Sequence, residues 1–152
     1  MSIISLETIQ LNAQAASKEE AIRMAGELLV KAGHVAPGYV DGMLAREQTM
    51  STYIGNGVAI PHGQFDDKAS IHSTGISVVQ FLDGIVWDDD DEDEKAYLVI
   101  GIAATANEHV GILTNLAEAI EEPDDAETLI RSTDPMQIIE RLSRPQEESE
   151  PA

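Results

Sequence analysis

The feature that most constrains the fold is the run AYLVIGIAA at 96–104, in which nearly every residue is apolar. A strand with one face in water alternates apolar and polar residues, so a continuous apolar run indicates a strand covered on both faces. The run is much shorter than the roughly 20 apolar residues that a membrane-spanning helix needs. It therefore predicts a central strand in a layered α/β domain, with helices packed on the sheet.

Around this strand, predicted strands and helices alternate along the chain. Apolar spacing and turn residues indicate further strands at 4–11, 57–63 and 75–82, and helices at 18–32, 37–47, 107–120, 124–131 and 135–143. No internal repeat or low-complexity linker divides the chain. We therefore expect one α/β domain at 1–144, a sandwich with a central mixed β-sheet flanked by helices on both faces, and a disordered acidic tail at 145–152.

Local signals indicate where several elements begin and end. Ser17 and Glu20 have the spacing of a capping box at the start of the first helix, and Gly33 offers its end. The pair Asp83-Gly84 predicts a turn after the strand at 75–82, and Asn107 predicts an N-cap for the helix that follows the central strand. These signals place loops at the ends of the strands, where a binding site can form.

The charge of the chain is strongly unbalanced, with 28 Asp and Glu residues against 9 Lys and Arg residues and a formal net charge of -19. Binding to nucleic acid or to an anionic membrane surface needs clustered basic side chains, so we expect no nucleic-acid partner. Self-repulsion on such a surface costs stability unless salt screens it. A salt-rich cytoplasm, as in a halophile, is one explanation of this acidity.

The chain also lacks features of secreted or membrane proteins. It has no cysteine, which removes disulfides, thiolate metal ligands and a cysteine nucleophile from consideration. Its first residues lack the basic and apolar segments of a signal peptide, and no apolar stretch reaches the length of a membrane span. We therefore expect a cytoplasmic protein without direct membrane insertion.

Histidines are the side chains here that titrate near neutral pH, and two of the four lie where a site is expected. His62 leaves the short strand in GVAIPHG directly after a proline, and His109 lies in the first turn of the helix after the central strand. Ligand sites in open α/β sheets gather at the carboxyl ends of strands, so the two rings could converge in one crevice. His34 and His72 lie in contexts that indicate surface positions.

The residues around these histidines suit an anion, in particular a phosphoryl group. A neutral imidazole nitrogen is a competent nucleophile near pH 7. Gly63 has no Cβ and so leaves room for the backbone of another molecule. The helix N-terminus near His109 favours both a neutral ring and a bound anion. Taken alone, however, each histidine is more often structural than functional.

Two charged features have simpler explanations when they are taken alone. Arg46, in the helix upstream of His62, is best explained as half of a surface ion pair with Asp41 or Glu47. The acidic run at 88–94 lacks the glycine and the spaced ligands of a calcium loop, so we interpret it as a solvated loop between strands.

Trp87, beside the acidic run, is expected to anchor part of that loop on the sheet.

The two histidines raise the question of a metal site. A metal-dependent hydrolase with His62 and His109 as ligands would need a spaced set of further His and Asp ligands, which the sequence lacks. We therefore expect no metal ligand among these residues.

The segment YIGNGVAIPHG at 53–63 resembles the active-site segment of enzyme IIA domains of the mannitol/fructose class, in the bacterial sugar phosphotransferase system. The resemblance covers almost the whole chain and is strongest in three places: GYVDGMLAREQTMSTYIGNGVAIPHG, LVIGIAATANEHVGILTNLAEAI, and the N-terminal strand and helix. The second stretch is most similar to the mannitol branch. Asn56 departs from the pattern, since relatives often carry Glu or Asp after the first glycine of the motif.

This resemblance implies a phosphocarrier. His62, in the IPHG motif, would accept a phosphoryl group from the phosphocarrier protein HPr and pass it to an enzyme IIB domain. That domain phosphorylates the sugar that the membrane-embedded enzyme IIC carries inward. His109 matches the second active-site histidine, with a role in phosphoryl stabilisation, and Arg46 matches the arginine of the MLxRE segment, with a role in charge neutralisation. No cofactor is implied.

The resemblance leaves a second function open. The same fold serves nitrogen-type enzyme IIA proteins, which regulate other proteins and have no role in transport. The sequence fixes neither the sugar nor the ring nitrogen of His62 that would carry the phosphoryl group. The choice between transport and regulation therefore depends on an assay with partner proteins.

Overall fold

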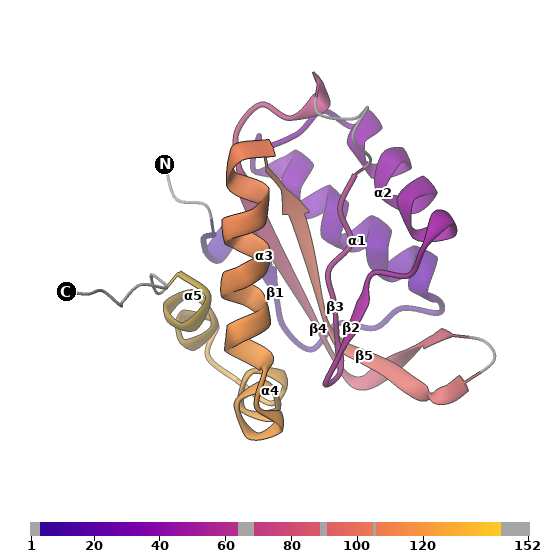
Figure 1. Ribbon diagram of the computed structural model, residues 1–152, viewed down its shortest axis with the longest axis vertical. Coiled ribbons are helices and arrows are strands. Elements are labelled where there is room, and N and C mark those ends of the chain that lie inside the picture. The colour runs from indigo at the N-terminus through magenta and orange to yellow at the C-terminus, as the bar shows by residue number, and fades with distance from the viewer. Residues whose placement is uncertain (1–3, 64–68, 89–90, 105, 144–152) are drawn as a thin grey trace.

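The computed structural model describes residues 4–63, 69–88, 91–104 and 106–143 of the chain. They form an α/β sandwich around a five-stranded sheet with the strand order β1-β4-β5-β3-β2 (Figure 1). The expected fold class is therefore confirmed, whereas the tail predicted at 145–152 lies outside the described residues. The elements in chain order are η1 (Leu6–Thr8), β1 (Ile9–Gln10), α1 (Lys18–Lys31), α2 (Gly38–Thr49), β2 (Tyr53–Gly55), β3 (Val58–Ala59), β4 (Gly75–Asp88), β5 (Asp91–Ala103), α3 (Ala106–Ile120), α4 (Pro123–Ile130) and α5 (Pro135–Ser143).

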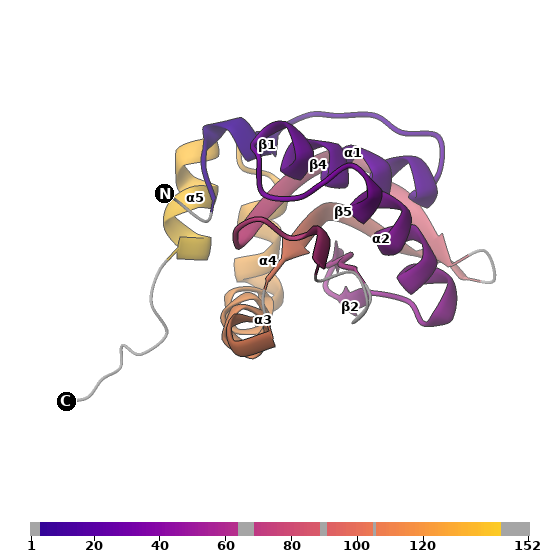
Figure 2. The ribbon, with the colours of Figure 1, turned by 90° about the horizontal axis from the view of Figure 1, so that it is seen from above.

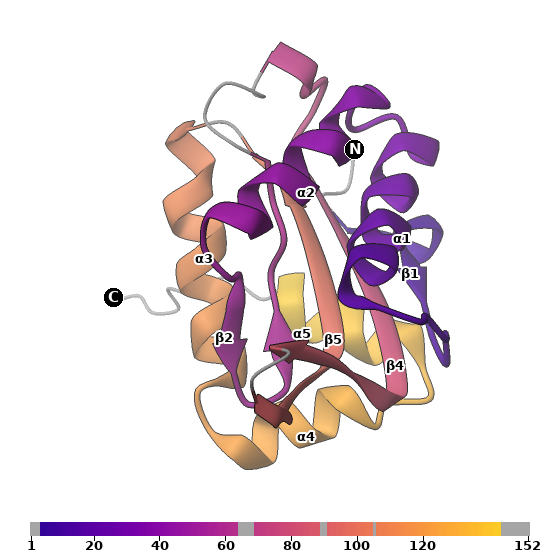
Figure 3. The same cartoon turned by 90° about the vertical axis from the view of Figure 1, so that its right-hand side faces the viewer.

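The sheet is mixed, as expected. β4 and β5 pair in antiparallel fashion through its centre, β1 runs parallel to β4, β3 runs parallel to β5, and β2 closes the edge as a hairpin with β3. Figure 3 shows α2 leading into this hairpin, which lies alongside β5. The long central hairpin therefore supports two short parallel strands, one on each side.

Two hydrophobic layers cover the two faces of the sheet. Figure 2 shows α1 and α2 on one side and α3 and α4 on the other. Neighbouring residues of β5 divide between these layers, since Val99 packs in the cluster with α1 and α2, and Leu98 and Ile100 pack in the cluster with α3, α4 and α5. The apolar run at 96–104 thus belongs to a strand that is covered on both faces.

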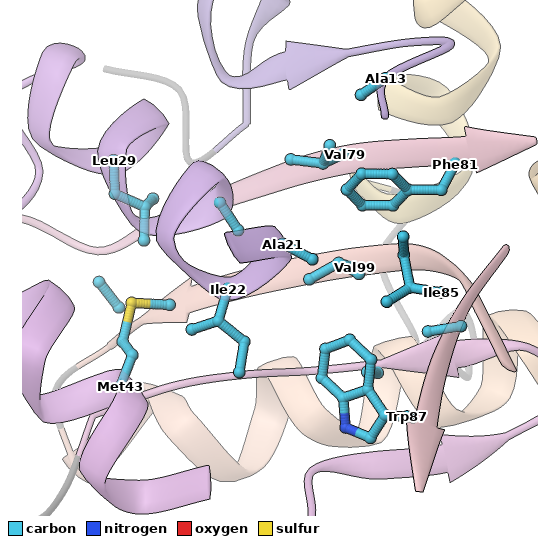
Figure 4. Close-up of a cluster of buried hydrophobic side chains, with 14 of the residues drawn as sticks. Ala13, Ala21, Ile22, Leu29, Met43, Val79, Phe81, Ile85, Trp87 and Val99 are labelled. Carbon is cyan, nitrogen blue, oxygen red and sulfur yellow. The ribbon is translucent and has the colours of Figure 1, made fainter. Parts of the chain in front are cut away.

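Mainly aliphatic side chains, with a few aromatic ones, build the layer under α1. Ile22 and Leu29 of α1 and Met43 of α2 pack over Val79 and Phe81 of β4 (Figure 4). All five side chains are at most 1% exposed. At about 1.5–3 kcal/mol for each large side chain that is fully buried, this layer is a major source of stability.

The carboxylate of Glu47 ties this layer to the loop that leads toward the site. The side chain is buried, and its Oε1 accepts hydrogen bonds from the backbone N–H and the hydroxyl of Thr52, at 3.0 and 2.6 Å. Its Oε2 accepts from Trp87 Nε1 at 3.0 Å and forms an ion pair with Lys18 Nζ at 3.3 Å. Glu47 therefore joins α2, the start of β2, the end of β4 and the start of α1. Trp87 is 1% exposed, so it is a core residue and more than the partial anchor that the sequence predicted.

The first helix begins and ends at the predicted signals. Ser17 Oγ accepts the N–H of Glu20 at 3.2 Å, while the Glu20 carboxylate reaches back to the N–H of Ala16 at 2.8 Å. Gly33, with φ +85°, follows the helix, and the N–H of His34 bonds to the carbonyl oxygen of Leu29. This pattern is a Schellman motif, which requires the left-handed residue that glycine supplies.

Two predictions about strands were partly wrong. The segment 4–11 forms a 3₁₀ turn at Leu6–Thr8 before a strand of only two residues. Asp83-Gly84 lies inside β4, where the pairing with β5 shifts register between Gln80 and Ile85, and not at a chain reversal. Gly84 has φ +78°, a conformation found in both turns and bulges, so the local residues alone do not distinguish the two. Within the described residues, no helix is long and apolar enough to cross a membrane.

The buried network at Glu47 generates a stability prediction. Glu47→Ala leaves the Trp87 N–H and two donors of Thr52 without their acceptor, and should lower the free energy of unfolding by about 3 kcal/mol. Glu127→Ala is the matched control, because the Glu127 carboxylate pairs with Arg131 at 2.9 Å but both side chains are exposed. The control should cost less than about 1 kcal/mol in urea unfolding followed by circular dichroism. Equal losses in the two variants would contradict this account of the core.

Candidate functional site

The site begins where the parallel strands β3 and β5 end. Val58 pairs with Leu98 and Ala59 with Val99, and an isolated parallel bridge then joins His62 to Ile102. Figure 1 shows the start of α3 at the same end of the sheet as the arrowhead of β5. The two strand exits predicted to carry the site therefore lie side by side at one edge.

His62 is half-buried at this edge, directly beyond β3. Its Nδ1 lies 3.0 Å from the carbonyl oxygen of Gly63. A carbonyl oxygen only accepts hydrogen bonds, so Nδ1 must carry the proton in this contact. In the neutral ring the lone pair then lies on Nε2, which makes Nε2 the nucleophilic nitrogen.

Tyr39, in the first turn of α2, holds the residue after the histidine. Its hydroxyl accepts the N–H of Gly63 at 2.9 Å and donates to the carbonyl oxygen of Ile102 at 2.8 Å. A Cβ on Gly63 would lie 2.5 Å from Tyr39 Cε1. The space that the missing side chain of Gly63 leaves is therefore filled by the tyrosine ring of the same chain, and the expected opening for another molecule is wrong.

The sequence interpretation did not single out Tyr39. A signal for it exists, because Tyr39 and Met43 are four residues apart on α2 and so share one helix face. That spacing predicts burial, and both side chains are indeed buried. It does not predict that the hydroxyl meets the backbone beyond His62, because that contact joins residues 24 positions apart.

The backbone of His109 lies in the first turn of α3, the helix that follows β5. The strand pairing thus brings this turn to the same edge of the sheet as His62. The side chain of His109 lies outside the described part of the structure, so the predicted meeting of the two rings stays a prediction. The helix begins at Ala106, which makes Asn107 its second residue and not the N-cap that was expected.

Arg46 lies in the last turn of α2 and is half-buried. Its Nη1 donates to the carbonyl oxygen of Met50 at 2.6 Å, which caps the end of its own helix. The expected ion pair with Glu47 or Asp41 does not form, because the carboxylate of Glu47 is buried in the network with Lys18 and no ion pair among the described residues involves Asp41. Arg46 lies seven residues after Tyr39, about 10 Å further along the helix, and its predicted role beside His62 stays a prediction.

The other two histidines differ from each other. His72 is exposed, as predicted, but His34 is buried, which contradicts its expected surface position. The ring of His34 packs on Gly75, where a Cβ would clash with it, and its Nδ1 lies 2.9 Å from Ser73 Oγ. Its carbonyl oxygen accepts the N–H groups of His72 and Ser73. Tertiary pairing of these two loops, which no local pattern reveals, buries the ring.

The two remaining features fit structural roles. The acidic run at 88–94 was expected to be a solvated loop, but β4 extends to Asp88 and β5 begins at Asp91, so most of the run belongs to strands and the expected loop is too long. In the described parts of the chain, no group of three His, Asp or Glu side chains could hold a metal ion. A hydrogen bond explains why asparagine replaces the usual Glu or Asp at position 56. The side-chain amide of Asn56 donates to the carbonyl oxygen of Ile120 at 2.6 Å, which a carboxylate could not do.

His62 thus lies half-buried at a strand exit, with the N-terminus of α3 at the same end of the sheet. The family model described as "Phosphoenolpyruvate-dependent sugar phosphotransferase system, EIIA 2" matches residues 2–144. The chain belongs to this family of phosphotransferase-system enzyme IIA domains.

Individual relatives and a solved structure show which members of the family this chain resembles. The chain is 42% identical over 138 residues to the mannitol-specific phosphotransferase enzyme IIA component of Halalkalibacterium halodurans, covering 91% of this chain and 92% of that protein. It is 47% identical to the multiphosphoryl transfer protein of Salmonella typhimurium over 86% of this chain, but spans only 34% of that protein's length. The solved complex of mannitol enzyme IIA with phosphorylated enzyme IIB from Escherichia coli matches with a TM-score of 0.85 and 42% identity, covering 91% of this chain and 96% of that chain.

The contact between Gly63 and Tyr39 generates a prediction. Gly63→Ala forces the new Cβ against a buried ring, so it should lower the free energy of unfolding by about 1–3 kcal/mol. Gly38→Ala is the control on the neighbouring helix, because a Cβ there meets no atom within 4 Å. The control should be neutral or slightly stabilising in the same urea titration. An unchanged stability of Gly63→Ala would show that the ring does not fill this space.

Proposed function

We propose that this domain is a phosphocarrier that accepts a phosphoryl group from HPr on Nε2 of His62 and donates it to an enzyme IIB domain. The observation that carries the proposal is the hydrogen bond from Nδ1 of His62 to the carbonyl oxygen of Gly63, at the shared exit of β3 and β5. Membership of the enzyme IIA family and the similarity to an enzyme IIA solved with phosphorylated enzyme IIB support the same assignment.

The transfer step needs no cofactor from this chain. The lone pair of Nε2 forms a bond to phosphorus as the bond between phosphorus and the donor atom of HPr breaks, and the donor leaves with that electron pair. The proton on Nδ1 stays in place, because the Gly63 carbonyl oxygen holds it. Onward donation to enzyme IIB reverses these roles, with Nε2 as the leaving atom. Catalysis of such a step is mainly positioning and electrostatic stabilisation.

Electrostatic support must be local, because a phosphoryl group brings roughly two negative charges to a chain whose net charge is already -19. The N-terminus of α3, with His109 in its first turn, offers backbone N–H groups and the positive end of the helix dipole. Arg46 is proposed to neutralise further charge after it exchanges the carbonyl oxygen of Met50 for a phosphoryl oxygen. The exchange costs little free energy, because the hydrogen bond to Met50 that it breaks lies near the surface.

The transport branch is the favoured setting. Relatives with mannitol in their names support a mannitol-like or fructose-like sugar or sugar alcohol as the end acceptor. In other relatives, enzyme IIA is one part of a fused mannitol-specific EIICBA component, of which this chain spans about a fifth. We therefore propose a cytoplasmic location, where the domain serves enzyme IIB and, through it, the membrane enzyme IIC. A nitrogen-type regulatory role is the alternative, and onward transfer to enzyme IIB and a sugar separates the two.

The acceptor assignment predicts the behaviour of a histidine variant. His62→Ala should keep the fold and lose phosphoryl acceptance from HPr, because it removes the nucleophilic nitrogen. His72→Ala is the matched control, since His72 is exposed and lies outside the strands. Acid-labile label after incubation with phosphorylated HPr measures both. Label on a histidine of His62→Ala would contradict the assignment.

The supporting residues predict a different outcome. Arg46→Ala and His109→Ala should each accept the phosphoryl group about ten- to a hundred-fold more slowly, because each removes charge stabilisation and leaves Nε2 intact. Arg23→Ala, an exposed position on α1, controls for loss of one positive charge elsewhere. Single-turnover transfer from phosphorylated HPr gives the rates. If Arg46→Ala transfers as fast as Arg23→Ala, the arginine has no part in the step.

A halophilic origin predicts that stability depends on salt. Screening of the negative charges should raise the free energy of unfolding by more than about 1 kcal/mol between 0.1 and 1 M KCl, because the Debye length falls from about 10 to about 3 Å. Urea unfolding in the two salt concentrations measures this difference. Full stability in dilute buffer, with no gain from salt, would argue against a halophilic adaptation.

A further inference from the structure

We infer that Tyr39 is a positioning residue for the phosphoryl transfer, acting on His62 through the backbone of Gly63. This inference rests on the proposed function of His62. It concerns a side chain that is 3% exposed and that belongs to a different element from the histidine.

The hydroxyl of Tyr39 lies where the next rung of the β3–β5 ladder would form. The N–H of Ile102 bonds to the carbonyl oxygen of Pro61 at 3.0 Å, as a parallel ladder requires. The following rung would pair the N–H of Gly63 with the carbonyl oxygen of Ile102. The hydroxyl bridges these two groups instead, accepting from the first at 2.9 Å and donating to the second at 2.8 Å. The hydroxyl thus takes the place of a direct hydrogen bond beside the bridge between His62 and Ile102.

Gly63 transmits this arrangement to the imidazole. The N–H of Gly63 bonds to Tyr39, and the carbonyl oxygen of Gly63 accepts from Nδ1 of His62 at 3.0 Å. The tyrosine ring also packs against Gly63 so closely that no side chain fits there. One residue is therefore fixed by both the ring and the hydroxyl of Tyr39, and the same residue selects the Nδ1–H form of the histidine ring.

Loss of the hydroxyl should affect the histidine in a defined way. Without it, the N–H of Gly63 and the carbonyl oxygen of Ile102 lose their shared partner inside the protein, which favours closure of the ladder. Closure of the ladder moves Gly63 toward β5 and away from the imidazole ring of His62. The carbonyl oxygen of Gly63 then no longer holds the proton on Nδ1. The neutral ring then also populates the Nε2–H form, in which Nε2 has no lone pair for phosphorus.

The chain offers a closely matched control. Tyr53, in β2, accepts the N–H of Gly57 on its hydroxyl at 3.2 Å. This contact is also a tyrosine hydroxyl on a glycine N–H, but it lies at the opposite end of β3 from His62. A purely structural tyrosine contact should therefore respond to substitution as Tyr53 does.

The experiment compares Tyr39→Phe with Tyr53→Phe and the unsubstituted protein. Long-range proton–nitrogen NMR with ¹⁵N-histidine reports the tautomer of His62, and single-turnover transfer from phosphorylated HPr reports the rate. Tyr39→Phe should show a raised fraction of the Nε2–H form and about ten-fold slower acceptance, because small misplacements of a reacting group are costly. Tyr53→Phe should keep the parent tautomer and stay within about two-fold of the parent rate.

Each outcome decides one point. If Tyr39→Phe matches Tyr53→Phe in both tautomer and rate, the inference is overturned while the proposed function stands. If the unsubstituted protein accepts no phosphoryl group on His62, the proposed function fails instead. Should Tyr39→Phe not fold, the unsubstituted protein still decides, because an Nε2–H form of His62 there would overturn the inference and the Nδ1–H form would support it.

Discussion

The parallel pairing of β3 with β5 is the constraint on which the rest of the structure depends. Parallel strands leave a sheet at the same edge, so the chain after β3 and the helix after β5 must meet there. β5 is held between two hydrophobic layers and cannot shift its register without exposing one of them, whereas β3 has only two residues. The long, buried strand β5 therefore fixes the position of the short strand β3, and pairing with Ile102 positions His62. The hydroxyl of Tyr39 then ends this pairing one residue later.

The distribution of charge follows the same geometry. The most acidic stretch of the chain surrounds the β4–β5 connection, at the start of β5, whereas the candidate site lies near its end. At the rise of a β-strand, the 13 residues of β5 separate these ends by more than about 30 Å, several Debye lengths at physiological salt. A phosphoryl group on His62, as proposed, would thus be largely screened from the densest negative charge. The groups that could offset it locally, the N-terminus of α3 and Arg46, belong to the elements beside the two strands.

Much of this fold is predictable from sequence, because its elements have strong local signals. The apolar run of β5, the caps of α1 and the placement of His62 after a strand all follow from spacing and residue type. Several of the failures share one cause, which is dependence on a partner far away in the sequence. Asp83-Gly84 becomes a bulge because β5 is long enough to pair past it. His34 is buried because the loop at 72–73 folds over it, and Tyr39 reaches Gly63 across 24 positions. Arg46 is a different case, since its bond to the carbonyl oxygen of Met50 joins residues only four positions apart.

The central claim is that His62 carries the phosphoryl group on Nε2 while the Gly63 carbonyl oxygen holds the proton on Nδ1. The most direct test is NMR of the phosphorylated protein with ¹⁵N-labelled histidine, in which coupling between phosphorus and nitrogen identifies the bonded atom. The account predicts coupling to Nε2 of His62, with Nδ1 still protonated. Coupling to Nδ1 of His62, or to a nitrogen of any other histidine, would contradict it.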